Sequence, residues 1–187
     1  MGAGEKFDRK KLQQILAQVL QSIGPAAATH EYRLVGTAAS LLHGVDIVAG
    51  DIDFLLRQRA GVDAFAAALA EFSCVKAPEL LEDDGQYMAI FSVDGVDVEL
   101  STVEWEVDGD TAECMGAGPW THFVALPCGP HQIPTVALEL RLLTEWSRGR
   151  ADRSGPIAAF MRGKPYDEAL LRRGLGDEAE RRLKELE

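Results

Sequence analysis

Two aspartates, Asp51 and Asp53, lie one residue apart in the apolar segment "DIDFLL". Residues two apart on a strand project to the same face, so both carboxylates are expected on one side while Ile52 and Phe54 enter the core. Neighbouring carboxylates repel each other and resist joint ionisation, a penalty that a bound cation removes. Because hard oxygen ligands suit magnesium, the spacing predicts a magnesium site at the edge of a sheet. The alternative is an exposed strand edge protected from aggregation by charge.

A second acidic pair occurs in "GVDVELS", where Asp97 and Glu99 alternate with apolar residues. Such alternation is also typical of the solvated face of a hairpin. If this strand lies beside "DIDFLL", one of the two becomes a third carboxylate. We take Asp97 as the first candidate and keep Glu99 as its rival. Three converging carboxylates can hold two metal ions that clamp a transferring phosphoryl group.

Upstream, the strand "YRLVG" is followed by Thr37 and a short Ala-rich segment. A glycine at a strand-to-helix turn lets the backbone approach a ligand closely. The start of the following helix directs free N–H groups at an anion, and Thr37 adds a hydroxyl. Gly36 and Thr37 are therefore a candidate phosphate site, although a plain turn with a helix cap would look the same. The chain contains no G-x-x-x-x-G-K-[ST] motif.

The elements that must position these residues can be read from apolar periodicity. Asp94-Gly95 between two alternating apolar runs is the clearest hairpin signal, and Asp108-Gly109 predicts a second turn. Gly24-Pro25 is expected to end the first helix, and Asp63 is expected to cap the third. Residues 111–135 are left unassigned. The expected helices are 7–23, 37–44, 62–72 and 136–149, followed by short charged helices, and the expected strands are 32–36, 51–57 and the strands of 86–107.

This order predicts an α+β fold with a mixed sheet rather than a doubly wound parallel sheet. We expect a core over residues 1–135, which includes the N-terminal helix, and a helical segment over 136–187 packed on that core. The formal net charge of −11 argues against a protein that grips long nucleic acid. Three scattered cysteines, the lack of an apolar signal core and the absence of a 20-residue apolar run favour a cytoplasmic protein without a membrane segment.

Taken together, these motifs resemble the DNA polymerase β-like nucleotidyltransferase superfamily, especially its small bacterial branch related to aminoglycoside- and lincosamide-type antibiotic nucleotidyltransferases. Members have an apolar strand ending in Gly-Gly or Gly-Ser, then Asp-x-Asp between apolar residues, then a third acidic residue on a neighbouring strand. Here the counterparts are Gly36, Thr37, Asp51, Asp53 and Asp97. The segment "IPTVALELRLLTEWSRGRAD" resembles a helix that relatives carry after these motifs.

The resemblance implies a mixed sheet flanked by helices and transfer of a nucleoside monophosphate from a nucleoside triphosphate such as ATP, with two magnesium ions, to a hydroxyl of a small molecule or protein. Asp51, Asp53 and Asp97 would be catalytic and metal-binding, and Gly36 and Thr37 would bind the nucleotide.

Two basic residues that many relatives have, before the aspartate pair and before the late acidic Asp152, are missing. The sequence does not decide which arginine replaces them, and the candidates are Arg33, Arg57, Arg59, Arg148 and Arg150. The missing charges motivate an alternative, an inactive member of the fold that acts as a binding or regulatory module of the toxin–antitoxin type.

Overall fold

The computed structural model describes residues 6–83, 85–103, 113–114 and 118–187. Its centre is a seven-stranded mixed sheet in the order β3-β4-β5-β2-β1-β7-β6. Strands β1 and β7 pair in parallel, as do β2 and β5, and the other neighbours are antiparallel. The strands are β1 (Tyr32–Val35), β2 (Asp51–Leu56), β3 (Ser73–Leu81), β4 (Gln86–Val93), β5 (Val96–Ser101), β6 (Phe123–Cys128) and β7 (His131–Val136).

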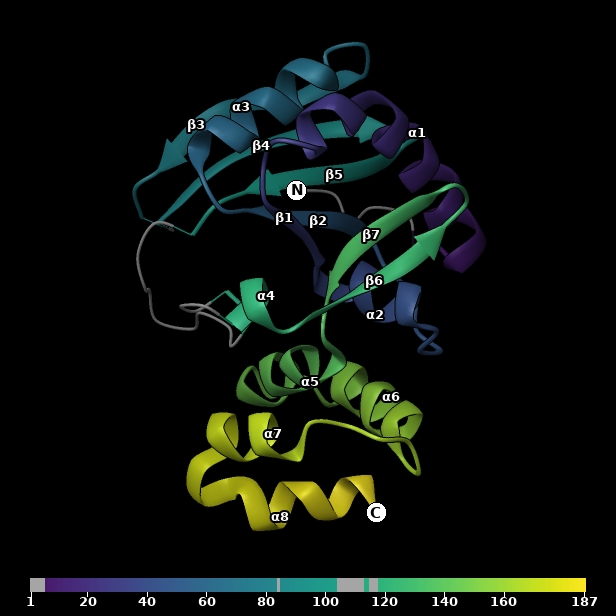
Figure 1. The fold of residues 1–187 in the computed structure, drawn as a ribbon, viewed down its shortest axis with the longest axis vertical. Helices are drawn as coiled ribbons and strands as arrows, with labels where there is room; N and C mark the ends of the chain where they lie inside the picture. Colours follow the sequence, from purple (N-terminus) through teal and green to yellow (C-terminus); the bar gives the residue numbers. More distant parts are fainter. Residues whose placement is uncertain (1–5, 84, 104–112, 115–117) are drawn as a thin grey trace.

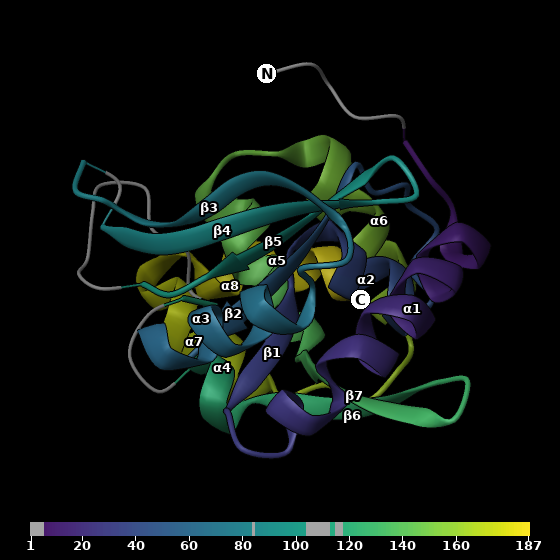
Figure 2. The same ribbon diagram turned by 90° about the horizontal axis from the view of Figure 1, so that it is seen from above.

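Helices flank the sheet on two sides (Figure 1). Helices α1 and α3 pack on one side, α5 to α8 form a layer on the other, and α2 lies between the sheet and that layer. The view from above shows the twist of the sheet and the β6–β7 hairpin projecting at its edge (Figure 2). The helices are α1 (Arg9–Ala27), α2 (Gly36–His43), α3 (Arg59–Ala68), α4 (Gly118–Thr121), α5 (Leu138–Ser147), α6 (Ala151–Met161), α7 (Glu168–Leu175) and α8 (Ala179–Leu183), with 3-10 turns at Gly176–Glu178 and Lys184–Leu186.

Alternation along β2 separates the core from the side that carries the aspartates. Ile52 and Phe54 are fully buried, whereas Asp51 is exposed and Asp53 is partly buried. Strand β5 lies parallel to β2, with Asp51 opposite Asp97 and Asp53 opposite Glu99. The expected pairing of these two strands is therefore confirmed, and their acidic residues share one side of the sheet.

The β4–β5 hairpin is also confirmed at its predicted turn. Asp94 and Gly95 both have positive φ, of 50° and 78°, as a two-residue turn between right-twisted strands requires. The mixed α+β architecture predicted from the element order is likewise present. The proposed boundary between 1–135 and 136–187 stays a prediction.

Several local predictions were wrong. Helix α1 continues through Pro25 to Ala27, since a proline in the last turn removes only one helical hydrogen bond. Asp63 does not cap α3, which begins four residues earlier at Arg59, and its carboxylate instead accepts a hydrogen bond from the Tyr87 hydroxyl at 2.7 Å. Strand β3 and the β6–β7 hairpin were not predicted. The predicted turn at 108–109 lies outside the described residues.

Across the described residues, no helix is long and apolar enough to cross a membrane. Cys74, Cys114 and Cys128 are free thiols. This agrees with the expectation from sequence that the cysteines form no disulfide framework.

Candidate active site

A pocket of about 350 Å³ opens between the sheet and helices α5 and α6. Three carboxylates from β2 and β5 line its sheet side, and we call them the carboxylate wall: Asp51, Asp53 and Glu99. Three arginines from the junction of α5 and α6 line its helical side, and we call them the arginine wall: Arg148, Arg150 and Arg153. Charges of opposite sign therefore meet in one cavity, which the buried Glu113, Arg141 and Glu145 line as well.

Within the carboxylate wall, crowding and burial disfavour ionisation. Burial raises the pKa of Asp53 well above its usual value, and the charges of Asp51 and Glu99 raise it further. Burial and Asp51 also raise the pKa of Glu99, an effect that a hydrogen bond from the Ser101 side chain partly offsets. Removing charge repulsion here would therefore favour the ionised forms, and a bound cation would do so.

Asp97 occupies a different position from Glu99 on the same strand. It lies opposite Asp51 in the sheet but is exposed, and it is not among the described residues that line the pocket. Glu99, two residues further along, reaches the pocket beside Asp53. The geometry therefore favours Glu99 as the third carboxylate, the alternative that the sequence left open, and a metal-binding role for Asp97 stays a prediction.

Gly36 and Thr37 line the same pocket at the start of α2. Gly36 has a φ of 68°, and a Cβ built on it would overlap an Asp53 carboxylate oxygen. A side chain at position 36 would therefore displace Asp53, so glycine is required both for the backbone turn and for the carboxylate. Val35 precedes the helix without a side-chain cap, which leaves the first N–H groups of α2 available for an anion.

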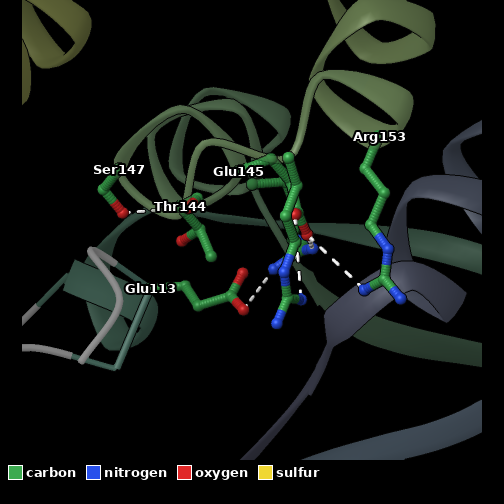
Figure 3. Close-up of polar contacts among 7 residues, drawn as sticks. Glu113, Thr144, Glu145, Ser147 and Arg153 are labelled. Carbon is green, nitrogen blue, oxygen red and sulfur yellow. Dashed lines mark hydrogen bonds and ion pairs between the residues drawn. The ribbon is translucent and has the colours of Figure 1, made fainter. Parts of the chain in front are cut away.

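Of the buried residues that line the pocket, Arg141 of α5 is 2% exposed and ion-paired with Glu113 and Glu145. Burial alone would lower the pKa of Arg141, but Glu113, Glu145 and the nearby Asp53 outweigh it and raise that pKa. Figure 3 shows Glu145 on its helix with Glu113 on one side and Arg153 reaching toward it from the neighbouring helix. The buried cluster therefore connects the two walls electrostatically.

The arginine candidates named from sequence fall into two groups. Arg148 and Arg150 line the pocket, whereas Arg33, Arg57 and Arg59 are not among its described lining residues. Arg33 is buried and donates to the backbone oxygens of Tyr32, Pro119 and Trp120. Arg57 lies over the Trp120 ring and Arg59 over the Tyr87 ring, both outside the pocket.

Sequence reasoning missed Arg153, Glu113 and the Arg141–Glu145 pair. One signal was present in the helix pattern, because Arg141 and Glu145 follow Leu138 at i+3 and i+7 and so fall on its core-facing stripe. A charged pair on such a stripe needs a buried partner or a site. Arg153 and Glu113 carry no comparable local signal.

The residues at the pocket supply the type of ligand that magnesium prefers, but they do not form a complete coordination shell. The carboxylate wall supplies the hard oxygens that magnesium prefers, and the lack of a side chain on Gly36 leaves room for the Asp53 carboxylate. Within the described part of the chain, however, no group of three or more His, Cys, Asp or Glu side chains is arranged to hold a metal ion. Magnesium usually keeps several waters and binds through one or two carboxylates plus substrate phosphates, so the residues fit an ion that the nucleotide completes. The expectation of two ions stays a prediction.

Comparison with known proteins supports the fold. No family model matches the chain, and no curated protein matches it either. Among solved structures, the chain is similar to a Thermotoga maritima protein whose crystal structure is described as that of "a putative nucleotidyltransferase". The TM-score is 0.59 at 17% sequence identity, and the match covers 82% of this chain and 94% of that one. At this identity the likeness shows a shared fold, and the expected relation to the antibiotic-type branch stays a prediction.

Proposed function

We propose that the protein is a metal-dependent nucleotidyltransferase that moves a nucleoside monophosphate from a nucleoside triphosphate to a hydroxyl group of a small molecule or protein. The observation that carries the proposal is the pocket, in which the carboxylate wall faces the arginine wall with the uncapped start of α2 beside them. A metal-bound triphosphate has both charges that this arrangement complements. The shared fold with the Thermotoga maritima protein supports the same reading.

The two walls suggest how the substrate is oriented. The outer phosphates would contact the arginine wall and the first N–H groups of α2, where Thr37 adds a hydroxyl donor. The α-phosphate would then lie toward Asp51 and Asp53. Magnesium, when bound there, would supply neutralisation of the phosphate charge, and Asp51, Asp53 and Glu99 are the residues that would hold it.

With the triphosphate held in this way, the acceptor oxygen forms a bond to the α-phosphorus as the bond from that phosphorus to the leaving pyrophosphate breaks. The hydroxyl proton passes to a carboxylate of the carboxylate wall. Glu99 is the candidate for this role because it lines the pocket from β5, opposite Asp53. Most of the rate would come from positioning and from stabilisation of the developing negative charge by the arginines.

The experiment that tests the proposal measures thermal unfolding with magnesium and each nucleoside triphosphate, followed by pyrophosphate release with the triphosphate that binds. A ligand at a hundred times its dissociation constant stabilises a protein by about 2.7 kcal/mol. An Asp51→Asn/Asp53→Asn double variant should lose the magnesium-dependent part of the shift and at least about a hundredfold in turnover. Absence of a shift with every triphosphate, or an equal shift in the double variant, would exclude the proposal.

Asp97 offers a matched control within β5. Glu99→Gln removes a carboxylate that lines the pocket, whereas Asp97→Asn removes one that shares the strand and the side of the sheet but lies outside the pocket. We expect turnover to fall with Glu99→Gln and to remain with Asp97→Asn, and the reverse result would assign the third carboxylate to Asp97. Thr37→Ala separately tests whether the protein is instead a phosphohydrolase, which would need the same carboxylates but not Gly36 and Thr37. Full activity of this variant would favour the phosphohydrolase. Loss of a hydrogen bond to a charged phosphate should weaken triphosphate binding by about 10- to 150-fold.

A second candidate, a nucleotide-binding or protein-binding module without turnover, is favoured by one observation. Arg141 is close enough to Asp53 for each charge to shift the pKa of the other, so a resident cation already partly neutralises a carboxylate that a metal ion would need. This candidate predicts triphosphate binding that does not depend on magnesium and no pyrophosphate release. Calorimetric titration of the triphosphate with and without magnesium separates the two functions.

A further inference from the structure

Glu145 lies at the centre of the arginines that line the pocket. Its side chain is fully buried, and it forms an ion pair with Arg141 one turn earlier on α5. Its two carboxylate oxygens also face the arginine wall, with Oε2 4.0 Å from Nη1 of Arg150 and Oε1 4.0 Å from Nη1 of Arg153. One buried carboxylate therefore lies near two cations that line the pocket, and Figure 3 shows one of them, Arg153, reaching toward it.

The pairs with Arg150 and Arg153 differ in kind from the pair with Arg141. At 4.0 Å they are too long for hydrogen bonds, and Oε2 of Glu145 has no hydrogen-bond partner within the described part of the chain. The side chains of Arg150 and Arg153 are 41% and 40% exposed, so their donor groups remain accessible to a ligand. Glu145 therefore attracts both guanidinium groups while their N–H groups stay available to donate hydrogen bonds to a ligand.

The backbone fixes the origin of these side chains. The Arg150 N–H donates to the Glu145 carbonyl oxygen at 2.9 Å, and Gly149 turns the chain with a φ of 65°. Arg153 follows one turn later on α6, on the same side as Arg150. Arg148 also lines the pocket but forms no ion pair with Glu145 or with another acidic residue of the described chain. It is therefore an internal comparison for the other two arginines.

We propose that Glu145 is a positioning residue that holds Arg150 and Arg153 over the pocket for the outer phosphates of the substrate. The proposal rests on the proposed function. A free arginine loses rotamer freedom when it is fixed on a ligand. A buried carboxylate that already restrains the side chain reduces this loss on binding, which is the general effect of pre-organisation. Because Arg141 neutralises one of its two carboxylate partners, the remaining negative charge of the buried cluster is available to attract the exposed arginines.

The test is a set of double-mutant cycles read out as the dissociation constant of inorganic tripolyphosphate, measured by calorimetry without metal. Arg150→Gln, Arg153→Gln and Arg148→Gln are each made in the wild-type and in the Glu145→Gln background. We expect Arg150→Gln and Arg153→Gln to weaken binding about threefold to tenfold more in wild type than in Glu145→Gln protein. Arg148→Gln should weaken binding by the same factor in both backgrounds. A general loss of structure in Glu145→Gln protein would not distinguish among the three arginines.

The proposal would be overturned if the two backgrounds gave the same fold-loss of tripolyphosphate affinity for all three arginine substitutions. It would also be overturned if Arg150→Gln and Arg153→Gln cost more affinity in Glu145→Gln protein than in wild type, which would mean that Glu145 competes with phosphate. If Glu145→Gln does not fold, the same cycles are run with Glu145→Asp, which keeps the charge but draws it back from the arginines, and the same difference among the arginines is expected. If wild-type protein does not bind tripolyphosphate, the inference is wrong. Failure of the proposed function is read separately, from pyrophosphate release with magnesium and nucleotide.

Discussion

Two arginines of this protein are almost fully buried, and their surroundings differ. Arg33 on β1 is 5% exposed, and Arg141 on α5 is 2% exposed. Arg33 donates hydrogen bonds to three backbone carbonyl oxygens and to the Glu31 carboxylate. Its guanidinium lies 3.8 Å from the centroid of the Phe123 ring. Arg141 instead pairs with two buried carboxylates, and its Nε has no hydrogen-bond partner among the described residues.

The pKa shifts of the two side chains have opposite signs. Burial lowers the pKa of Arg33, because its mostly neutral partners offset only part of the desolvation. The carboxylates around Arg141 outweigh its burial and raise its pKa. Arg33 is thus a structural anchor that ties α4 and the start of β6 to β1. Arg141 is part of the charge balance of the pocket. The two arginines share residue type and burial, so it is the charge of their partners that distinguishes the site residue from the core residue.

The largest effect on stability is expected from Arg141→Met. The substitution leaves Glu113 and Glu145 buried without their cation, and breaking a buried pair in this way typically costs about 3–5 kcal/mol. Urea denaturation should show this loss in the free energy of unfolding. Arg172→Met is the control, because Arg172 forms its ion pairs at the solvent-screened surface and its loss should change stability little. A loss for Arg141→Met no larger than that of the control would contradict the assignment.

A smaller loss is expected from Arg33→Met, about 1.5–3 kcal/mol, because hydrogen bonds from a charged donor are lost but no buried carboxylate is stranded. The sharper expectation concerns ligand binding. Since Arg33 lies outside the pocket, tripolyphosphate affinity should stay within about twofold of wild type, as for independent sites. An Arg33 variant that folds normally but binds tripolyphosphate markedly more weakly would return this residue to the list of substrate-binding arginines.

The sequence was most informative where a local rule determines the structure. Alternation placed Asp51 and Asp53 on one side of β2, and Asp94-Gly95 located the hairpin that brings β5 into the sheet. Together with the order of the elements, these two features led to the predicted α+β fold and to a predicted set of carboxylates on neighbouring strands. The choice between Asp97 and Glu99 could not be made, because it depends on how far along β5 the pocket extends.

The arginine wall was beyond local rules for a different reason. Arg148 and Arg150 were candidates together with Arg33, and nothing in their neighbouring residues separates a surface arginine from one that faces a cavity. The separation arises only when α5 and α6 pack beside the sheet, a long-range contact. Strand β3 was missed because Lys76, Pro78 and Glu79 interrupt its apolar pattern, and the strand tolerates them at the edge of the sheet with shifts in register.

The smallest of these effects concerns pH and the carboxylate that lies near Arg141. The pKa of Asp53 is raised in the folded protein above its usual 3.8, so the folded state holds a proton that the unfolded state releases. This contribution to stability is fully present below the unfolded pKa and is lost as pH rises through the folded pKa. Urea denaturation at several pH values gives the unfolding free energies of wild type and Asp53→Asn. As pH rises above about 4, the stability of wild type relative to Asp53→Asn should therefore fall. A pH-independent difference between wild type and Asp53→Asn would show that Arg141 already compensates the charge of Asp53 completely.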